Sequence, residues 1–255
     1  MIIDADVHIS PTPEGGNSIT SDELLRRMDY AGVDRALTWL QPPYKREIAA
    51  ANRYVYDAMQ AHPDRILGFG WVDPHLGLDR MRDELKRCVE EYGLYGVKLN
   101  GAQNNFYIDD PELSLPLAEA IAATGTVLAF HIGTDAYEAT HPFRLGKIAA
   151  RFPETRILMV HMGGVGFHDL SNAAIEVLQA HSNITGIGTA MRHINIQKII
   201  RAVGADRVCF GSDAPFALMH VEGAAYQALL QDGFSESEQA AVMGGNIARV
   251  LGVGL

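Results

Sequence analysis

The first residues of this chain combine an apolar segment with groups that can bind a metal ion or transfer a proton. In the segment IIDADVHIS, Asp4, Asp6 and His8 are spaced two residues apart. In an extended strand this spacing places the three side chains on the same face. A charged group buried in an apolar strand is costly unless it is paired or bound to a metal. The segment therefore predicts a partner elsewhere in the chain, either an opposite charge or a metal ion.

Further polar residues of this kind lie in other apolar segments. His131, His161 and Asp213 each stand near the end of a separate segment, and Lys98 lies in a fourth. Imidazole nitrogen and carboxylate oxygen are ligand atoms suited to zinc, manganese or iron. A lone histidine of this kind is more often a hydrogen-bonded core residue, and Asp213 alone could cap a helix. Together they favour a metal site, because each buried group costs desolvation.

Short apolar segments rich in β-forming residues must position these groups. Such segments cover residues 2–9, 35–40, 65–72, 95–100, 126–133, 156–164, 183–190 and 207–215. Their nearly continuous hydrophobicity is typical of parallel strands that are covered on both faces.

Amphipathic helical segments separate most of these predicted strands. In the first, Thr20 and Glu23 fit a capping box, and Gly32 fits a C-terminal cap. Others cover residues 48–65, 77–93, 111–125, 144–156, 194–207 and 235–253, and Pro116 is a candidate helix start.

Alternation of strands and helices over this length predicts an α/β fold, a (β/α)8 TIM barrel, as one catalytic domain over residues 1–255. An open doubly wound sheet is the alternative, but no G-x-G-x-x-G motif follows the first strand. In a barrel the carboxyl ends of the strands meet at one mouth, so the polar residues would converge there.

The composition excludes several classes of partner. The chain has 255 residues and a formal net charge of −10, which argues against nucleic acid or an anionic membrane as the main partner. No segment approaches the roughly 20 apolar residues of a membrane helix, and no leader pattern precedes the first strand. We therefore expect a cytoplasmic protein with a small-molecule substrate, and we expect Cys88 and Cys209 to stay reduced.

These motifs together resemble the amidohydrolase superfamily, in the branch that also contains aminocarboxymuconate-semialdehyde decarboxylase. The resemblance covers nearly the whole chain and includes, in order, DADVHIS, AGVDRALTW, HPDRILGFGWVDP, GVKLN, AFHIG, ILMVHMGG, FGSDAPF and GGNIARVLGV. The order and spacing of these motifs are specific to the family, although not to one reaction.

The resemblance implies roles for particular residues. It implies one divalent metal, zinc in the first place and manganese as the alternative, held by Asp6, His8, His131 and Asp213. Asp213 would also take the proton of metal-bound water, and His161 would act as a general acid or base. Both are thus the candidate catalytic residues.

Lys98 has more than one interpretation. In two-metal members of the superfamily a lysine on this strand is carbamylated and bridges the metals, whereas one metal is favoured here. Lys98 is then a candidate for substrate binding or for pairing with Asp4.

Arg192 and His168 are further candidates for substrate binding, since an arginine fork suits a carboxylate. Tyr44, Lys45 and Arg46 follow the second predicted strand and would lie near the same mouth. A homodimer is implied by the resemblance alone.

Three reactions or roles remain open at this stage. The leading hypothesis is metal-dependent hydrolysis of a small carboxylate-bearing ester, lactone or amide by metal-activated water. The alternative is non-oxidative decarboxylation of an aromatic or muconate-type acid at the same site. A barrel that only binds a metabolite is the third. The chain is shorter than many characterised decarboxylases, which favours hydrolysis.

Overall fold

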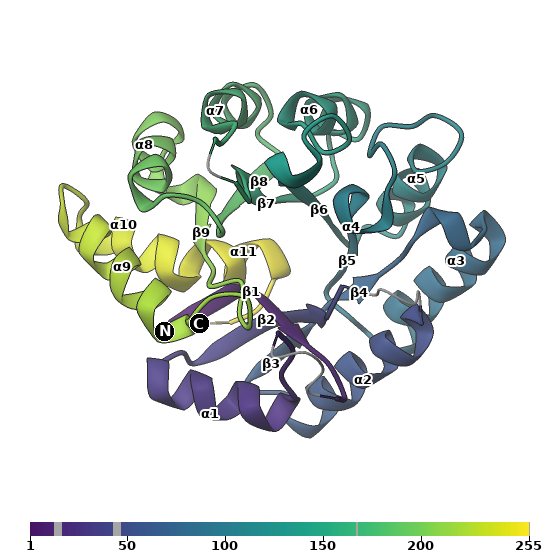
Figure 1. Ribbon diagram of the computed structural model, residues 1–255, viewed down its shortest axis with the longest axis horizontal. Helices are drawn as coiled ribbons and strands as arrows, with labels where there is room; N and C mark the ends of the chain where they lie inside the picture. Colours follow the sequence, from purple (N-terminus) through teal and green to yellow (C-terminus); the bar gives the residue numbers. More distant parts are fainter. Residues whose placement is uncertain (13–16, 43–46, 167, 255) are drawn as a thin grey trace.

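The computed structural model describes residues 1–12, 17–42, 47–166 and 168–254, in which strands form an inner ring and helices surround it (Figure 1). The strands are β1 (Ile3–Ile9), β2 (Arg35–Leu40), β3 (Ile66–Gly68), β4 (Gly70–Trp71), β5 (Gly96–Leu99), β6 (Val127–Gly133), β7 (Ile157–Gly164), β8 (Ile184–Gly188) and β9 (Val208–Phe210). The α-helices are α1 (Ser21–Ala31), α2 (Ile48–Ala61), α3 (Leu78–Lys86), α4 (Gly101–Asn104), α5 (Leu115–Ala123), α6 (Pro142–Arg151), α7 (Ser171–Ala180), α8 (His193–Val203), α9 (Met219–Gln231), α10 (Glu236–Ala240) and α11 (Asn246–Leu251). The 3₁₀ and π segments are η1 (Pro74–Leu76), η2 (Arg87–Glu91), η3 (Thr134–Ala136), η4 (Ala205–Arg207) and η5 (Ala241–Gly245).

The strands form a closed parallel barrel. β1, β2 and β3 pair in that order, and β4 to β9 pair in sequence. β3 and β4 are two halves of one strand interrupted at Phe69, whose amide still donates to the Thr38 carbonyl at 2.9 Å. The ring closes where Val7 of β1 pairs with Ala214, just after β9. The predicted (β/α)8 barrel is therefore confirmed.

Local sequence signals explain several helix ends. Thr20 caps α1 by accepting the amide of Glu23, and Gly32 ends this helix with a left-handed φ of 68°. Pro116 lies in the first turn of α5, where its missing amide proton is not needed. The prediction omitted α7 and α9, because their many small and apolar residues give a less distinct polar face.

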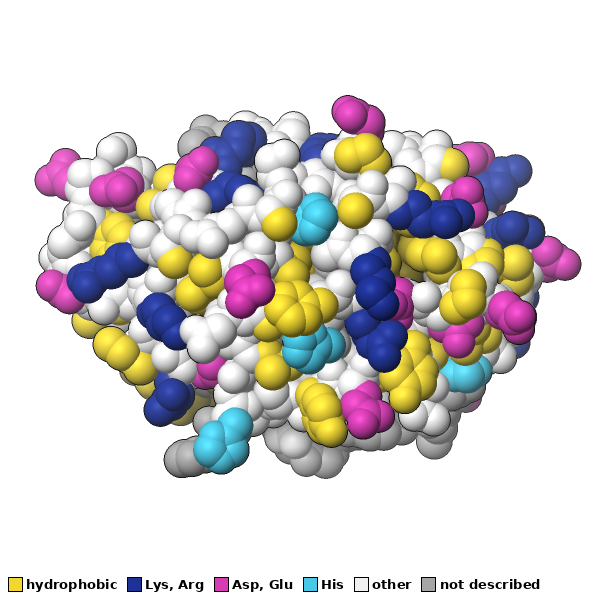
Figure 2. All heavy atoms as spheres, turned by 90° about the horizontal axis from the view of Figure 1, so that it is seen from above, with side chains coloured by type: hydrophobic (Ala, Val, Ile, Leu, Met, Phe, Trp, Pro, Cys, Tyr) yellow, Lys and Arg dark blue, Asp and Glu magenta, His cyan; other side chains and the backbone are white. Residues whose placement is uncertain are grey.

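The core fills the barrel interior and the layer between strands and helices. Nearly every strand residue is buried, as expected for strands covered on both faces. On the side of the molecule seen in Figure 2, charges of both signs are interspersed with small hydrophobic groups. Among the described helices, none has both the length and the apolar character needed to cross a bilayer.

Irregular backbone occurs next to the polar residues of the strands. The pairing register shifts between Asp4 and Val7 in β1 and between His131 and Gly133 in β6. His161 and Asp213 have backbone φ values of 70° and 59°, which residues other than glycine rarely adopt. Such conformations cost on the order of 1–3 kcal/mol and concentrate at functional sites.

Gly96 begins the strand that carries Lys98 and has no room for a side chain. A Cβ atom there would lie 2.1 Å from Cζ of Phe69 and 2.3 Å from the Val127 carbonyl oxygen. We expect Gly96→Ala to lower the free energy of unfolding by about 2 kcal/mol or more, measured by urea denaturation. Gly223→Ala is the control, since its nearest neighbour is 3.9 Å away and alanine favours the helix α9. Equal stability of the two variants would contradict this account of the barrel.

Candidate active site

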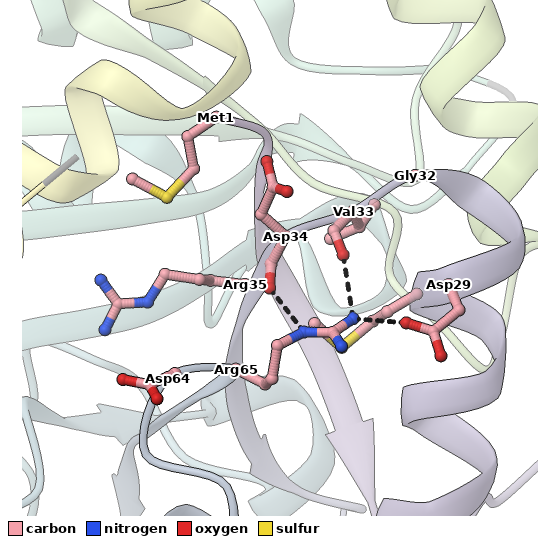
Figure 3. A pocket seen from close by; sticks show the side chains of 9 residues that line it. Met1, Asp29, Gly32, Val33, Asp34, Arg35, Asp64 and Arg65 are labelled. Atoms are coloured by element: carbon pink, nitrogen blue, oxygen red, sulfur yellow. Dashed lines mark hydrogen bonds and ion pairs between the residues drawn. The ribbon is translucent and has the colours of Figure 1, made fainter.

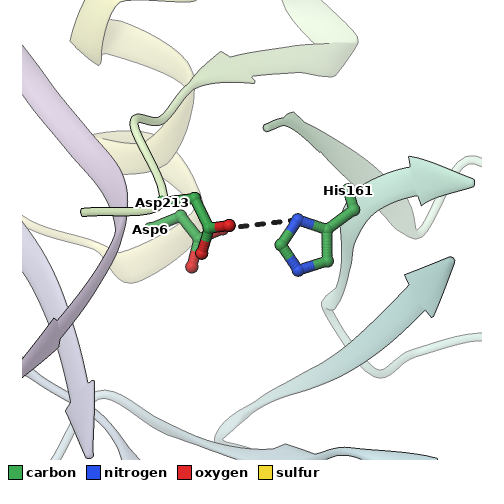
Figure 4. A group of neighbouring side chains, drawn as sticks. All are labelled: Asp6, His161 and Asp213. Atoms are coloured by element: carbon green, nitrogen blue, oxygen red, sulfur yellow. Dashed lines mark ion pairs between the residues drawn. The ribbon is translucent and has the colours of Figure 1, made fainter. Parts of the chain in front are cut away.

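Asp6, His161 and Asp213 come together although they lie far apart in the sequence (Figure 4). One ligand atom from each lies within 4.8 Å of the other two. His8 adjoins this group, with Nε2 at 3.7 Å from Oδ1 of Asp6 and 3.6 Å from Oδ1 of Asp213. These four side chains are buried: Asp6 and His8 lie on β1, His161 lies on β7, and Asp213 follows β9. They form the predicted mouth of the barrel.

The Asp6 carboxylate is at the centre of this group. Its Oδ2 accepts the hydroxyl proton of Thr189 at 2.7 Å. Its Oδ1 is buried and has no hydrogen-bond partner in the part of the chain that the structure describes. The Nζ atom of Lys98 lies 3.8 Å from this oxygen. One oxygen of Asp6 is thus committed to the protein, and the other faces positive charge without a direct bond.

Lys98 is fully buried beside Asp6. Its Nζ lies 3.7 Å from the centroid of the Trp39 ring, so the ammonium also gains a cation–π contact. Burial lowers the pKa of Lys98 to about 8, and the carboxylates of Asp6 and Asp213 oppose this shift. Lys98 therefore pairs with Asp6, and the sequence-based alternative of a pair with Asp4 is wrong.

Asp4 is not part of this group but binds the backbone of the segments that carry it. Its Oδ1 accepts the amides of Asp6 at 3.1 Å and of Ser212 at 2.9 Å. Burial raises the pKa of Asp4 to about 7. Because Ser212 precedes Asp213, Asp4 ties the first strand to the segment that carries the last polar residue.

Hydrogen bonds determine which ring nitrogen of His161 carries the proton. Nδ1 of His161 lies 2.7 Å from the hydroxyl oxygen of Thr189. The single proton of that hydroxyl is already donated to Asp6, so the hydroxyl must accept from His161. Nδ1 is therefore protonated, and the lone pair of His161 is on Nε2.

The same reasoning applies to His8. Nδ1 of His8 lies 2.7 Å from the Leu40 carbonyl, which can only accept, so Nδ1 carries the proton. Nε2 then has the lone pair and accepts the indole N–H of Trp39 at 3.1 Å. A cation bound by Nε2 would replace the Trp39 hydrogen bond.

The electrostatics of the site favour neutral histidines and a cation. Burial, aided by Lys98, lowers the pKa of His8 to about 3, and burial lowers the pKa of His161 well below its ordinary value. Burial and the neighbouring Asp6 carboxylate raise the pKa of Asp213 well above its ordinary value, although Lys98 opposes them. The imidazoles are therefore neutral and available as ligands. The raised pKa of Asp213 indicates that the site lacks the positive charge needed to balance its carboxylates.

His131 lies beside the group but has another partner. Its ring centroid is 4.6 Å from that of His161, and its Nε2 lies 2.9 and 3.0 Å from the two carboxylate oxygens of Asp135. The structure therefore brings all the predicted ligands into one region, with His161 rather than His131 inside the tightest cluster. Which of them bind metal stays a prediction.

The remaining predicted residues lie outside this cluster. Arg192 precedes α8 and His168 follows β7, and both are exposed. Tyr44, Lys45 and Arg46 lie outside the described residues. Thr189, Asp135 and Trp39 were missed by the sequence reasoning. Thr189 directly follows β8, and Asp135 is the second residue after β6, which carries His131; a polar residue so close to a strand end is a weak signal that could have indicated them.

A cavity of about 750 Å³ lies at the opposite end of the barrel (Figure 3). Met1, Asp34 and Arg35 line it at the amino ends of β1 and β2. Arg65 projects there, but it donates to the Asp34 carbonyl at 2.8 Å and to Asp29 at 2.8 Å. Because polar groups at this end of a TIM barrel generally serve stability, the cavity is not the candidate active site.

Two curated proteins are similar to the chain in sequence. One is the 2-amino-3-carboxymuconate-6-semialdehyde decarboxylase of Dictyostelium discoideum, 23% identical over 253 residues, which cover 84% of this chain and 69% of that protein. The other is a gamma-resorcylate decarboxylase of Polaromonas sp. (strain JS666), 26% identical over 255 residues, covering 76% of this chain and 77% of that protein.

Solved structures share the fold. The 5-carboxyvanillate decarboxylase of Sphingomonas paucimobilis superposes with a TM-score of 0.78, at 20% identity, over 99% of each chain. A dihydroxybenzoic acid decarboxylase of Polaromonas sp. JS666, with bound manganese and the inhibitor 2-nitroresorcinol, superposes with a TM-score of 0.76 at 19% identity, over 98% of this chain and 96% of that one.

These relatives contradict the prediction of a hydrolase, since the two curated relatives and both of these structural neighbours are decarboxylases. The sequence argument failed because chain length does not separate the two reactions: a decarboxylase barrel matches over 99% of both chains. Hydrolases and decarboxylases of the superfamily share ligands and fold, so the site residues alone could not decide.

The sequence profile of the amidohydrolase family matches residues 3–253, which is nearly the whole chain. The match agrees with the barrel and with the cluster of carboxylates and histidines at its mouth. The chain therefore belongs to the amidohydrolase family.

Proposed function

We propose that this protein is a metal-dependent, non-oxidative decarboxylase of an aromatic or muconate-type acid. The observation that carries the proposal is the buried cluster of Asp6, His161 and Asp213 with His8 beside it. The reaction type is supported by the two curated relatives, which are decarboxylases of such acids.

The residues of the cluster fit a divalent metal ion. Oδ1 of Asp6 is buried without a hydrogen bond in the described chain, and Nε2 of His8 and of His161 carry lone pairs. Lys98 is a single positive charge beside the carboxyl groups of Asp6 and Asp213, and a dication would supply the further positive charge that both need when they are ionised. Asp6, His8, His131 and Asp213 are the proposed ligands. Manganese is supported by the structural neighbour that contains it, and zinc suits the same donor atoms.

The substrate carboxylate requires positive charge at the mouth. A divalent ion, when bound, would supply charge that orients an anionic substrate and polarises it. Lys98 adds a second positive charge from the barrel interior, 3.8 Å from Asp6. Arg192 and His168 are proposed to contact the substrate from the exposed loops after β8 and β7.

Asp213 is proposed to supply the proton that replaces CO₂. One ligand atom of Asp213 lies within 4.8 Å of ligand atoms of Asp6 and His161, so its carboxylate can take up a proton at the metal site and pass it to the substrate. Asp213 donates this proton to the substrate carbon that bears the carboxylate. The carbon–carboxylate bond then breaks, its electrons return to the conjugated system, and CO₂ leaves. His161, with Nε2 as its accepting atom, assists the return of a proton from solvent to Asp213.

The direct test is product analysis on purified protein. We expect CO₂ release from at least one of 2,6-dihydroxybenzoate, 5-carboxyvanillate and 2-amino-3-carboxymuconate-6-semialdehyde. Treatment with a chelator should abolish the release, and added manganese or zinc should restore it. Full activity in metal-free protein, or no CO₂ from any of these acids by the metal-loaded protein, would contradict the proposal.

Replacing Asp213 tests the proton donor. Asp213→Asn keeps the shape of the side chain but removes the transferable proton, so we expect turnover to fall by about 10²–10⁴-fold. Steady-state kinetics with the active substrate measures the loss, and metal analysis shows whether the ion is retained. A variant that keeps both metal and wild-type turnover would exclude Asp213 as the acid.

Replacing Thr189 tests the link between Asp6 and His161. Thr189→Val has nearly the same shape but leaves Asp6 Oδ2 without its donor and His161 Nδ1 without its acceptor. We expect the free energy of unfolding of the metal-free protein to fall by about 2–3 kcal/mol in a urea titration. Thr189→Ser keeps the hydroxyl and is the control. If the valine and serine variants unfold at the same urea concentration, the link does not stabilise the site.

A further inference from the structure

His131 is hydrogen-bonded to a carboxylate, which distinguishes it from the other site histidines. His8 donates to the carbonyl of Leu40, and His161 donates to the hydroxyl of Thr189. His131 instead faces both carboxylate oxygens of Asp135, at 2.9 and 3.0 Å from Nε2. An ionised carboxylate only accepts hydrogen bonds, so Nε2 carries the proton and the lone pair of His131 is on Nδ1.

The loop after β6 is built to hold Asp135 in this place. Asp135 lies in η3, four residues after His131. Thr134 donates its hydroxyl to the Gly164 carbonyl at 3.1 Å, which ties the loop to the strand of His161. The Thr140 hydroxyl lies 3.0 Å from the carbonyls of both Gly133 and Ala136, so it closes the other side of the loop.

Gly133 provides the space for the carboxylate. A Cβ atom at this position would lie 2.8 Å from Oδ1 of Asp135 and 2.8 Å from Cγ2 of Val165. Any larger residue would push the Asp135 side chain away from the ring of His131. The small size of Gly133 and the hydrogen bonds of the loop therefore both keep the Asp135 carboxylate against the ring of His131.

We propose that Asp135 is a positioning residue that fixes His131 with its proton on Nε2 and presents Nδ1 to the metal ion. A negative acceptor behind an imidazole makes the opposite nitrogen a stronger ligand and fixes the orientation of the ring. His8, the other proposed histidine ligand, presents Nε2 instead. The proposal rests on the metal centre of the proposed function but not on the reaction that it performs.

Asp135 also connects the site with its surroundings. Its side chain is 24% exposed and lines a cavity of about 490 Å³ together with Phe106, Tyr107 and Tyr137. The hydrogen bond to His131 thus lies at the boundary between the buried site and this aromatic-lined cavity, where solvent reaches one side of the carboxylate.

The test uses the full-length protein with three substitutions. Asp135→Ala removes the acceptor, Asp135→Asn keeps a neutral acceptor of the same shape, and Glu138→Gln is a control in the same loop. The Glu138 carboxylate contacts the exposed hydroxyls of Tyr107 and Tyr137, and it makes no contact with His131 among the interactions described for this loop. A His131→Gln variant identifies the resonances of His131.

Two measurements report on these variants. In metal-free wild-type protein, nitrogen-15 spectra should show a hydrogen-bonded, slowly exchanging proton on Nε2 of His131. Asp135→Ala should lose this signal and bind manganese and zinc about 10–100-fold more weakly in a competition titration. Asp135→Asn should retain the signal with a smaller loss of affinity, and Glu138→Gln should match the wild type.

Other outcomes overturn the proposal. They are a proton on Nδ1 of His131 in the wild type, or wild-type metal affinity in Asp135→Ala. Tight metal binding without CO₂ release would contradict the proposed reaction and leave the role of Asp135 intact. A wild-type protein that binds neither ion would overturn both.

Discussion

The site is organised around one buried carboxylate, that of Asp6. Thr189 donates to one of its oxygens, and Lys98 lies 3.8 Å from the other without forming a hydrogen bond. Through Thr189 the same carboxylate determines the protonated nitrogen of His161. An uncompensated charge at this depth would destabilise the barrel, so the neighbouring side chains are those that can balance it or share a cation with it.

Much of the fold could be predicted because its signals are local. Apolar segments of β-forming residues mark the strands, and Thr20 and Gly32 mark the ends of α1. The candidate ligands could be named because carboxylates and imidazoles recur in several such segments, and because the order of the motifs resembles that of the amidohydrolase superfamily. The weakly patterned α7 and α9 lacked a comparable signal and were missed.

The supporting contacts could not be predicted, because they depend on distance in space. Thr189 is an ordinary strand-end hydroxyl in the sequence, yet it lies 183 residues from Asp6 and bonds to it. Lys98 and Trp39 are in contact inside the barrel, and no sequence motif links the two residues. The reaction was also beyond the sequence pattern, since the same ligands serve different chemistry and loops of unknown shape select the substrate.

The closure of the barrel has a consequence for how the chain reaches its native state. Asp6 and Asp213 stand at the two edges that meet, where the Asp213 amide donates to the Asp6 carbonyl at 2.9 Å and Asp4 accepts the amide of Ser212. During synthesis, the acidic residues of β1 emerge first, and their partners near β9 emerge only after most of the chain has been made. The contacts that join the two ends of the chain can therefore form only after β9 has been made, and the site cannot be complete before then.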